Sequence, residues 1–210
     1  MKKRTLWRAL VFLAAFGLWT LAVSRFDVRP IGPLDSAVGF AALNGTVHDL
    51  TGVNWTLYTI TDWLGLIPIC IVLIFGLLGL VQWIRRKHLL LVDRSILILG
   101  GLYLAVMAAF LLFETFPINY RPVLIDGVLE VSYPSSTTML ALCVMPSALM
   151  QLNARIQNGT LKGCIALAVR LFTGFMVIGR LLSGVHWVTD IIGGALLSAG
   201  LVLMYDYFSN

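Results

Sequence analysis

Three polar residues near the C-terminus, Arg180, His186 and Asp190, have the types and the spacing of an anion site with a nucleophile. His186 and Asp190 are four residues apart, so on a helix they would share one face at about 5–6 Å. The Asp190 carboxylate would then accept the imidazole Nδ1–H and leave Nε2 as a free lone pair. Arg180 carries a planar, always charged guanidinium that suits phosphate oxygens. The stretch predicts an oriented histidine beside an anion clamp, although interfacial polar residues with no shared role would have the same spacing.

A second group of polar residues precedes this stretch in the chain. Residues 133–137 read Tyr-Pro-Ser-Ser-Thr. Proline favours the first turn of a helix, where free backbone N–H groups form an anion site. The hydroxyls of Ser135 and Ser136 would add donors to such a site, or would only cap the helix. Further upstream, Arg121 followed by Pro122 adds another guanidinium in a polar connector.

These stretches resemble the three signatures of the type 2 phosphatidic acid phosphatase superfamily. Residues 180–190 match the third signature, which is Arg, five residues, His, three residues and Asp, and they include Gly184 just before the histidine. Residues 134–137 resemble the second signature, Pro-Ser-Gly-His or Pro-Ser-Ser-His. The Arg121-Pro122 pair resembles the end of the first signature. The resemblance implies a membrane lipid phosphatase.

The resemblance also implies a mechanism. His186 would attack phosphorus to form a phosphohistidine, which water then hydrolyses, while Asp190 orients the imidazole and stabilises its charged form. Charge grows on the equatorial phosphate oxygens during such a transfer, so positioned donors accelerate it. The phosphate-binding residues implied here are Arg121, Ser135, Ser136 and Arg180, and no cofactor is implied.

Three positions depart from the family pattern. Thr137 stands where the second signature has His, Glu114 stands where the first has Lys, and Gly179 stands where Ser usually precedes the arginine. The missing histidine would have protonated the leaving oxygen, and losing such an acid lowers a rate roughly 10²–10⁴-fold. A phosphate leaves without that proton more readily than an alkoxide does. The departures therefore favour a lipid diphosphate substrate, such as a polyprenyl diphosphate, or a weakened turnover.

Two residues are candidates to replace the missing groups. Glu114 would donate a proton at membrane depth, pair with Arg121 or Arg180, or be a bystander at the end of a span. His48, the only other histidine on the outer side, could in principle fold over the site, but a solvated loop histidine is expected. Three functions stay open: a phosphatase acting on phosphatidate-type lipids or polyprenyl diphosphates, a lipid-phosphate binding or transport protein without turnover, and a transferase that passes phosphate from the histidine to another acceptor.

The elements that must position these residues are membrane helices. Of the 210 residues 59% are hydrophobic and 12% are charged, about half the charged share of a soluble domain. We expect an all-α integral membrane protein with a six-helix bundle in one domain and an interfacial segment between the first two spans. The basic head and first apolar run would also fit a cleaved signal peptide. The spans are expected at residues 7–24, 58–83, 95–113, 135–152, 164–182 and 187–207.

The distribution of basic residues predicts the orientation in the cell membrane. Lysines and arginines gather around residues 2–8, 85–94 and 155–170, and such residues favour the cytoplasmic side. Both termini are then cytoplasmic and the site residues extracytoplasmic. The pI near 9.4 reflects this topology rather than nucleic-acid binding, so the expected partners are the bilayer and a lipid phosphate. The sequence gives no sign of the oligomeric state. The cysteines lie in apolar runs without ligand spacing, so no metal is expected.

Overall fold

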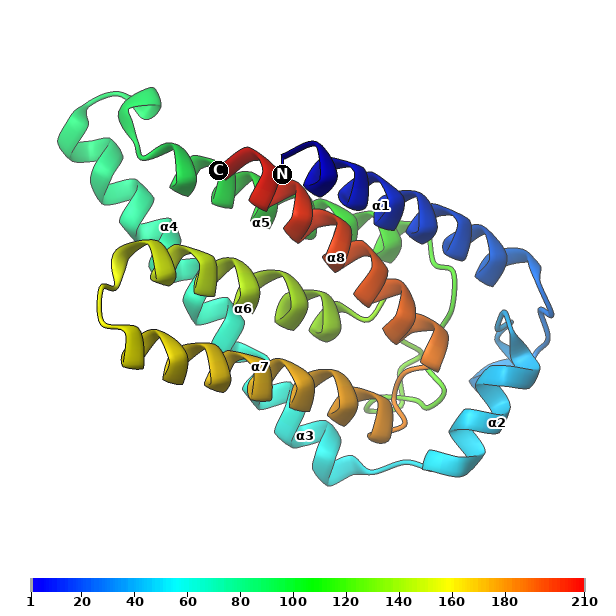
Figure 1. Cartoon of the computed structure of the whole chain (residues 1–210). Coiled ribbons are helices and arrows are strands. Elements are labelled where there is room, and N and C mark those ends of the chain that lie inside the picture. The colour runs from blue at the N-terminus through cyan, green and yellow to red at the C-terminus, as the bar shows by residue number, and fades with distance from the viewer. Residues whose placement is uncertain (1, 210) are drawn as a thin grey trace.

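A computed structural model, which describes residues 2–209, shows a bundle of helices with no β-strand among those residues (Figure 1). Six helical segments are long and apolar enough to cross a membrane, with α3 and α4 counted as one segment. The expected six-helix membrane bundle is therefore confirmed, and the chain is a multi-pass membrane protein. The elements are α1 (Lys2–Arg25), η1 (Pro33–Asp35), α2 (Ala41–Thr51), α3 (Trp55–Leu64), α4 (Leu66–Arg86), η2 (Leu89–Leu91), α5 (Arg94–Thr115), α6 (Ser136–Arg155), α7 (Gly159–Leu182) and α8 (Val188–Ser209).

The second span is broken between α3 and α4 at Gly65. The Gly65 N–H donates to the carbonyls of Thr61 and Asp62, both at 3.0 Å. A side chain at Gly65 would bring its Cβ to 2.9 Å from the Asp62 carbonyl oxygen, so the break suits glycine. Helix α3 packs against α7, while α4 packs against α5 and α6.

Helix α8 lies inside the bundle, where it packs against α1, α5 and α6. The approach of α1 to α8 is close at Gly200, where an added Cβ would lie 2.6 Å from Leu13 Cδ2. The indole of Trp19 on α1 also donates to the Thr189 carbonyl at 3.1 Å. Helix α1 is thus an integral part of the packed bundle.

The segment between α1 and α3 forms η1 and α2, which lie across one end of the bundle (Figure 1). Asn44 of α2 is buried, and its amide donates to the Gly39 carbonyl at 2.7 Å and to Thr189 Oγ1 at 2.9 Å. The Thr189 N–H returns a bond to Asn44 Oδ1 at 3.3 Å. These bonds hold α2 against the start of α8.

We call this end the α2 end of the bundle. It is where α1, α5 and α7 end and where α3, α6 and α8 begin. The two chain termini lie together at the opposite end (Figure 1). The connectors between α1 and α3, between α5 and α6, and between α7 and α8 therefore all lie at the α2 end.

Candidate active site

The connector between α5 and α6 delivers Arg121 to the α2 end. This connector is folded back on itself by isolated antiparallel bridges, one of which pairs Tyr120 with Val131. The Arg121 N–H donates to the Glu130 carbonyl at 2.9 Å, and Arg121 Nε lies 2.9 Å from Glu130 Oε2. The guanidinium is thereby held in place and largely buried, while the Glu130 carboxylate remains partly exposed.

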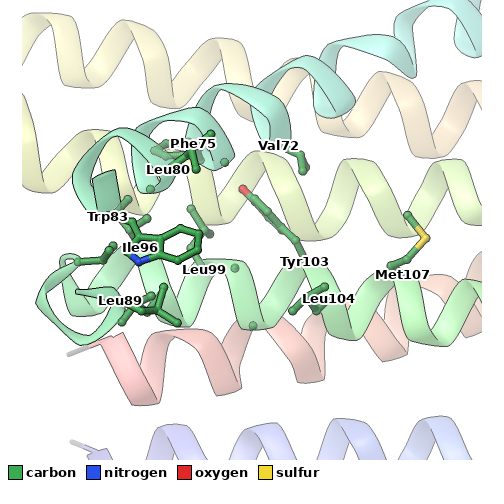
Figure 2. A pocket seen from close by; sticks show the side chains of 16 residues that line it. Val72, Phe75, Leu80, Trp83, Leu89, Ile96, Leu99, Tyr103, Leu104 and Met107 are labelled. Atoms are coloured by element: carbon green, nitrogen blue, oxygen red, sulfur yellow. The ribbon is translucent and has the colours of Figure 1, made fainter. Parts of the chain in front are cut away.

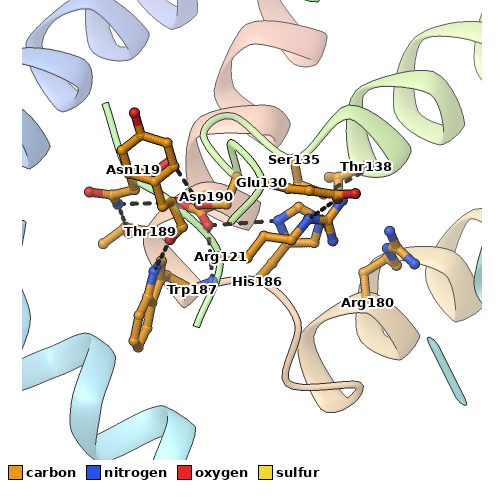
Figure 3. Close-up of polar contacts among 12 residues, drawn as sticks. Asn119, Arg121, Glu130, Ser135, Thr138, Arg180, His186, Trp187, Thr189 and Asp190 are labelled. Carbon is orange, nitrogen blue, oxygen red and sulfur yellow. Dashed lines mark hydrogen bonds and ion pairs between the residues drawn. The ribbon is translucent and has the colours of Figure 1, made fainter. Parts of the chain in front are cut away.

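His186 lies in the short loop between α7 and α8. Gly184, two residues earlier, has a φ of +66°, and an added Cβ would lie 1.8 Å from the Gly52 carbonyl oxygen, so only glycine fits there. The loop turns the His186 side chain into the bundle, where 4% of the residue is exposed. Its Nε2 lies 3.4 Å from Arg121 Nη1 (Figure 3).

Asp190 faces His186 but is held by other groups. His186 Nδ1 and Asp190 Oδ2 are 3.7 Å apart, which is longer than a hydrogen bond. The expected shared helical face does not form, because α8 begins at Val188 and His186 precedes it. Asp190 Oδ2 instead accepts the Trp187 N–H at 3.0 Å, which caps α8, and Oδ1 accepts from the Asn119 amide at 3.2 Å. The carboxylate is thus fixed where it can stabilise an imidazolium.

Arg180 is buried in the last turn of α7, with 1% of the residue exposed. Its Nη1 donates to Thr61 Oγ1 at 3.3 Å and lies 3.8 Å from Asp62 Oδ1, and its Cζ lies 5.0 Å from the Tyr58 ring centre. Its buried Nε has no hydrogen-bond partner among the described residues. Gly179 allows this packing, because an added Cβ would lie 2.8 Å from Thr61 Cγ2. A buried guanidinium with so little compensation is suited to an anionic ligand.

The electrostatic environment keeps His186 neutral. Burial lowers the His186 pKa well below its usual value, and the charges of Arg121 and Arg180 lower it further. A neutral imidazole whose Nε2 faces a guanidinium presents a lone pair there. This is the form in which a histidine acts as a nucleophile.

The Pro-Ser-Ser stretch contributes to the site unevenly. Ser135 is the N-cap of α6, and its Oγ accepts the Thr138 N–H at 3.4 Å. Its own N–H donates to the Asp190 carbonyl at 3.2 Å, so it joins α6 to α8. Ser136 lines the same cavity as His186, whereas Thr137 is buried in the first turn of α6. The structure therefore gives the Ser135 hydroxyl a capping role and places Ser136, like His186, in the wall of the small cavity.

Glu114 and His186 both line a small cavity at the α2 end. Glu114 lies at the end of α5 and forms no ion pair within residues 2–209. The pairing of Glu114 with either arginine is not seen, since the arginines lie beside Glu130 and Asp62. The other residues that line the cavity are Phe110, Phe113, Val131, Ser132, Tyr133, Pro134 and Ser136.

His48 differs from the expected solvated loop histidine. It lies on helix α2 and is partly buried, with its ring centre 5.5 Å from that of Trp187. Burial lowers its pKa, against an opposing effect of Asp49. His48 does not line the cavity that holds His186.

Sequence reasoning missed several residues that hold the site together. Asn119 fixes Asp190, Glu130 fixes Arg121, and Thr61 contacts Arg180. None of them stands in a recognisable spacing to its partner, so no sequence signal marks them. Within residues 2–209, no three His, Cys, Asp or Glu side chains gather as metal ligands.

Comparison with known proteins gives a clear result for the fold. No protein-family model and no curated protein sequence matches the chain. Among solved structures, it is similar to the crystal structure of a transmembrane PAP2-type phosphatidylglycerolphosphate phosphatase from Bacillus subtilis. The TM-score is 0.69, the match covers 95% of this chain and 94% of that chain, and the sequences are 15% identical. The expectation drawn from the three signatures is confirmed for the fold: this chain has the fold of the transmembrane PAP2-type phosphatases.

Proposed function

We propose that the protein is a membrane phosphatase that hydrolyses lipid phosphates or diphosphates through a phosphohistidine at His186. The observation that carries the proposal is the arrangement at the α2 end. A neutral, buried histidine directs Nε2 at Arg121, and Arg180 is buried nearby with an unpartnered Nε. In a PAP2-type fold, this arrangement supports phosphoryl transfer.

The arrangement supports a two-step reaction. A phosphate held by the two guanidinium groups would replace the contact between Arg121 and His186, and would meet the Nε2 lone pair. When His186 attacks, the imidazole becomes positive, and the Asp190 carboxylate 3.7 Å from Nδ1 stabilises that charge. Water then hydrolyses the phosphohistidine. Asn119 keeps Asp190 in position throughout.

Apolar clefts between the helices support a lipid as the substrate. A cavity of about 680 Å³ lies between α4 and α5, with almost wholly apolar walls (Figure 2). A second cavity of about 370 Å³ shares Val72, Tyr103 and Met107 with the first, and shares Phe110 and Ser136 with the cavity at His186. The two apolar clefts and the small cavity at His186 are therefore neighbours along α4, α5 and α6. An acyl or prenyl chain would pack against these apolar walls.

The similar Bacillus subtilis protein also supports a lipid substrate, since its name makes it a phosphatidylglycerolphosphate phosphatase. For the orientation, we propose that the α2 end is extracytoplasmic. Lysines and arginines gather at the opposite end, for example in the last turn of α4 and at the start of α1. Such residues favour the cytoplasmic side of a membrane.

Phosphate release by the purified protein in detergent tests the proposal. The substrates are a phosphatidate-type monophosphate and a polyprenyl diphosphate. We expect release by the wild type and a loss of several orders of magnitude in His186→Ala, because the nucleophile is gone. His48→Ala is the matched control and should retain activity, since His48 lies outside the cavity.

Other outcomes distinguish the alternative functions. Full activity in His186→Ala would contradict the proposal. Lipid binding without phosphate release by the wild type would favour a binding or transport protein. Phosphate found on a second lipid or sugar instead of in solution would favour a transferase.

A further inference from the structure

We propose that Glu114 transfers the protons of the reaction: it protonates the leaving oxygen and later accepts a proton from the attacking water. This inference rests on the proposed phosphatase function. It gives Glu114 the role of general acid, because Thr137 replaces the histidine that has this role in the family's second signature. With such an acid, the site can cleave a wider range of substrates.

The position of Glu114 is the first argument. The side chain lines the same cavity as His186 and Ser136, at the point where α5 ends. The residue is exposed, so the carboxyl group can exchange protons with water at the membrane surface. Proton transfer requires this combination of closeness to the reacting atoms and access to solvent.

The second argument is that the neighbouring acidic groups are already engaged. Glu130 lies 2.9 Å from Arg121 Nε, and Asp62 lies 3.8 Å from Arg180 Nη1. Asp190 accepts two hydrogen bonds and lies on the Nδ1 side of the imidazole, away from the attacking Nε2. Glu114 is the carboxyl group that lines the cavity and forms no ion pair within residues 2–209.

The tyrosine of the cavity is poorly suited to the same role. The Tyr133 hydroxyl lies 2.8 Å from Thr20 Oγ1 in a hydrogen bond. Burial raises the pKa of Tyr133, so it is a weak acid. Thr137, which stands in place of the family histidine, has a hydroxyl that does not titrate near neutral pH.

The two steps balance with this single residue. In the first, the His186 Nε2 lone pair forms the N–P bond, the bond from phosphorus to the leaving oxygen breaks, and that oxygen takes the Glu114 proton. In the second, a water oxygen attacks phosphorus, the N–P electron pair returns to Nε2, and the Glu114 carboxylate takes the water proton. The net reaction adds one water and releases an alcohol, or a lipid monophosphate, together with inorganic phosphate.

This assignment changes the expectation for the substrate. Without an acid, the site would favour diphosphates, whose leaving group needs no proton. With Glu114 as the acid, alkoxide leaving groups are also accepted, so lipid monophosphates are cleaved as well. The dependence on Glu114 should therefore be large for monophosphates and small for diphosphates.

The test compares wild type and Glu114→Gln, purified as full-length chains, on phosphatidate and on farnesyl diphosphate. We expect kcat on phosphatidate to fall roughly 10²–10⁴-fold, as for the loss of a general acid. On the diphosphate, kcat should fall less than about tenfold by the same reasoning. Glu114→Asp, which keeps a carboxyl group, should regain part of the monophosphate activity.

Glu130→Gln is the matched control, since it neutralises the carboxylate that pairs with Arg121 in the connector between α5 and α6. It should raise KM on both substrates alike. If the wild type is active and Glu114→Gln loses activity equally on both substrates, or loses none, the role assigned to Glu114 is wrong. The proposed phosphatase function would still stand. A wild type that releases no phosphate from either lipid would overturn the proposed function and this inference with it. Thermal unfolding in detergent shows whether each variant is folded.

Discussion

At the scale of single residues, His186 is surrounded by groups that oppose its protonation. Burial has the largest effect on its pKa, and the guanidinium groups of Arg121 and Arg180 add to it. The same guanidinium groups would bind the phosphate. One arrangement thus prepares both the nucleophile and the anion site, and phosphate binding would relieve part of the charge repulsion between the two guanidinium groups.

The pH dependence of activity follows from this arrangement. Neutral His186 is the active form, and its pKa lies below the usual value, so kcat/KM should persist as the pH falls below about 6.5. Arg121→Gln removes a charge that lowers this pKa, so the acid limb should move to higher pH. The pH profiles of the wild type and of Arg121→Gln are measured on the same substrate, so that the titration of the substrate affects both profiles equally. A limb that stays in place or moves to lower pH would contradict the account.

The residue types at the site could be predicted from the sequence, but their contacts could not. The spacing of His186 and Asp190 suggested a shared helical face, whereas the structure starts α8 between them and uses Asp190 as a cap. Asn119 bonds to Asp190 across 71 positions in the sequence, and no spacing between the two residues predicts this contact. Such contacts depend on the folded connector, which carries no periodic pattern.

At the scale of elements, the apolar runs predicted the six spans because burial in lipid requires long apolar helices. The break at Gly65 and the docking of α2 could not be predicted in the same way. The break depends on which neighbours α3 and α4 pack against, and α2 is held by buried Asn44 bonds.

Gly193 and Gly194, which follow Asp190 in α8, allow α8 to pack closely against the start of α6. An added Cβ at Gly193 would lie 2.6 Å from Tyr133 Cε2. Tyr133 has little freedom to move, because its ring stacks on Phe16 at 6.4 Å and its hydroxyl bonds to Thr20. Gly193→Ala should therefore reduce stability by about 1–3 kcal/mol, the usual effect of overpacking.

Thermal unfolding in detergent measures this effect. Gly174→Ala is the control, because Gly174 is also helical but has no atom within 4 Å of an added Cβ. Alanine is the better helix former, so this variant should be as stable as the wild type or more stable. Equal stability of the two variants would show that α8 does not approach Tyr133 so closely.

At the scale of the whole molecule, the candidate site and the chain termini lie at opposite ends of the bundle. The site residues lie at the α2 end, and the termini lie at the other (Figure 1). The proposed orientation places the site outside the cytoplasm. Single cysteines at exposed positions test this orientation in intact cells, with Val128→Cys at the α2 end and Gln157→Cys in the connection between α6 and α7.

A membrane-impermeant maleimide should label Val128→Cys in intact cells and Gln157→Cys only after permeabilisation. The wild type gives the background, since Cys143 is buried and Cys70 and Cys164 lie within α4 and α7. The reverse labelling pattern would place the site in the cytoplasm.

The most direct test of the central claim is to trap the covalent intermediate. Purified protein is mixed briefly with a lipid phosphate labelled at phosphorus, quenched under alkaline conditions that preserve phosphohistidine, and digested for mass spectrometry. The account expects phosphate on His186 and none in His186→Ala. An active wild type that carries the label on another residue would contradict the account, as would phosphate release by His186→Ala at the wild-type rate.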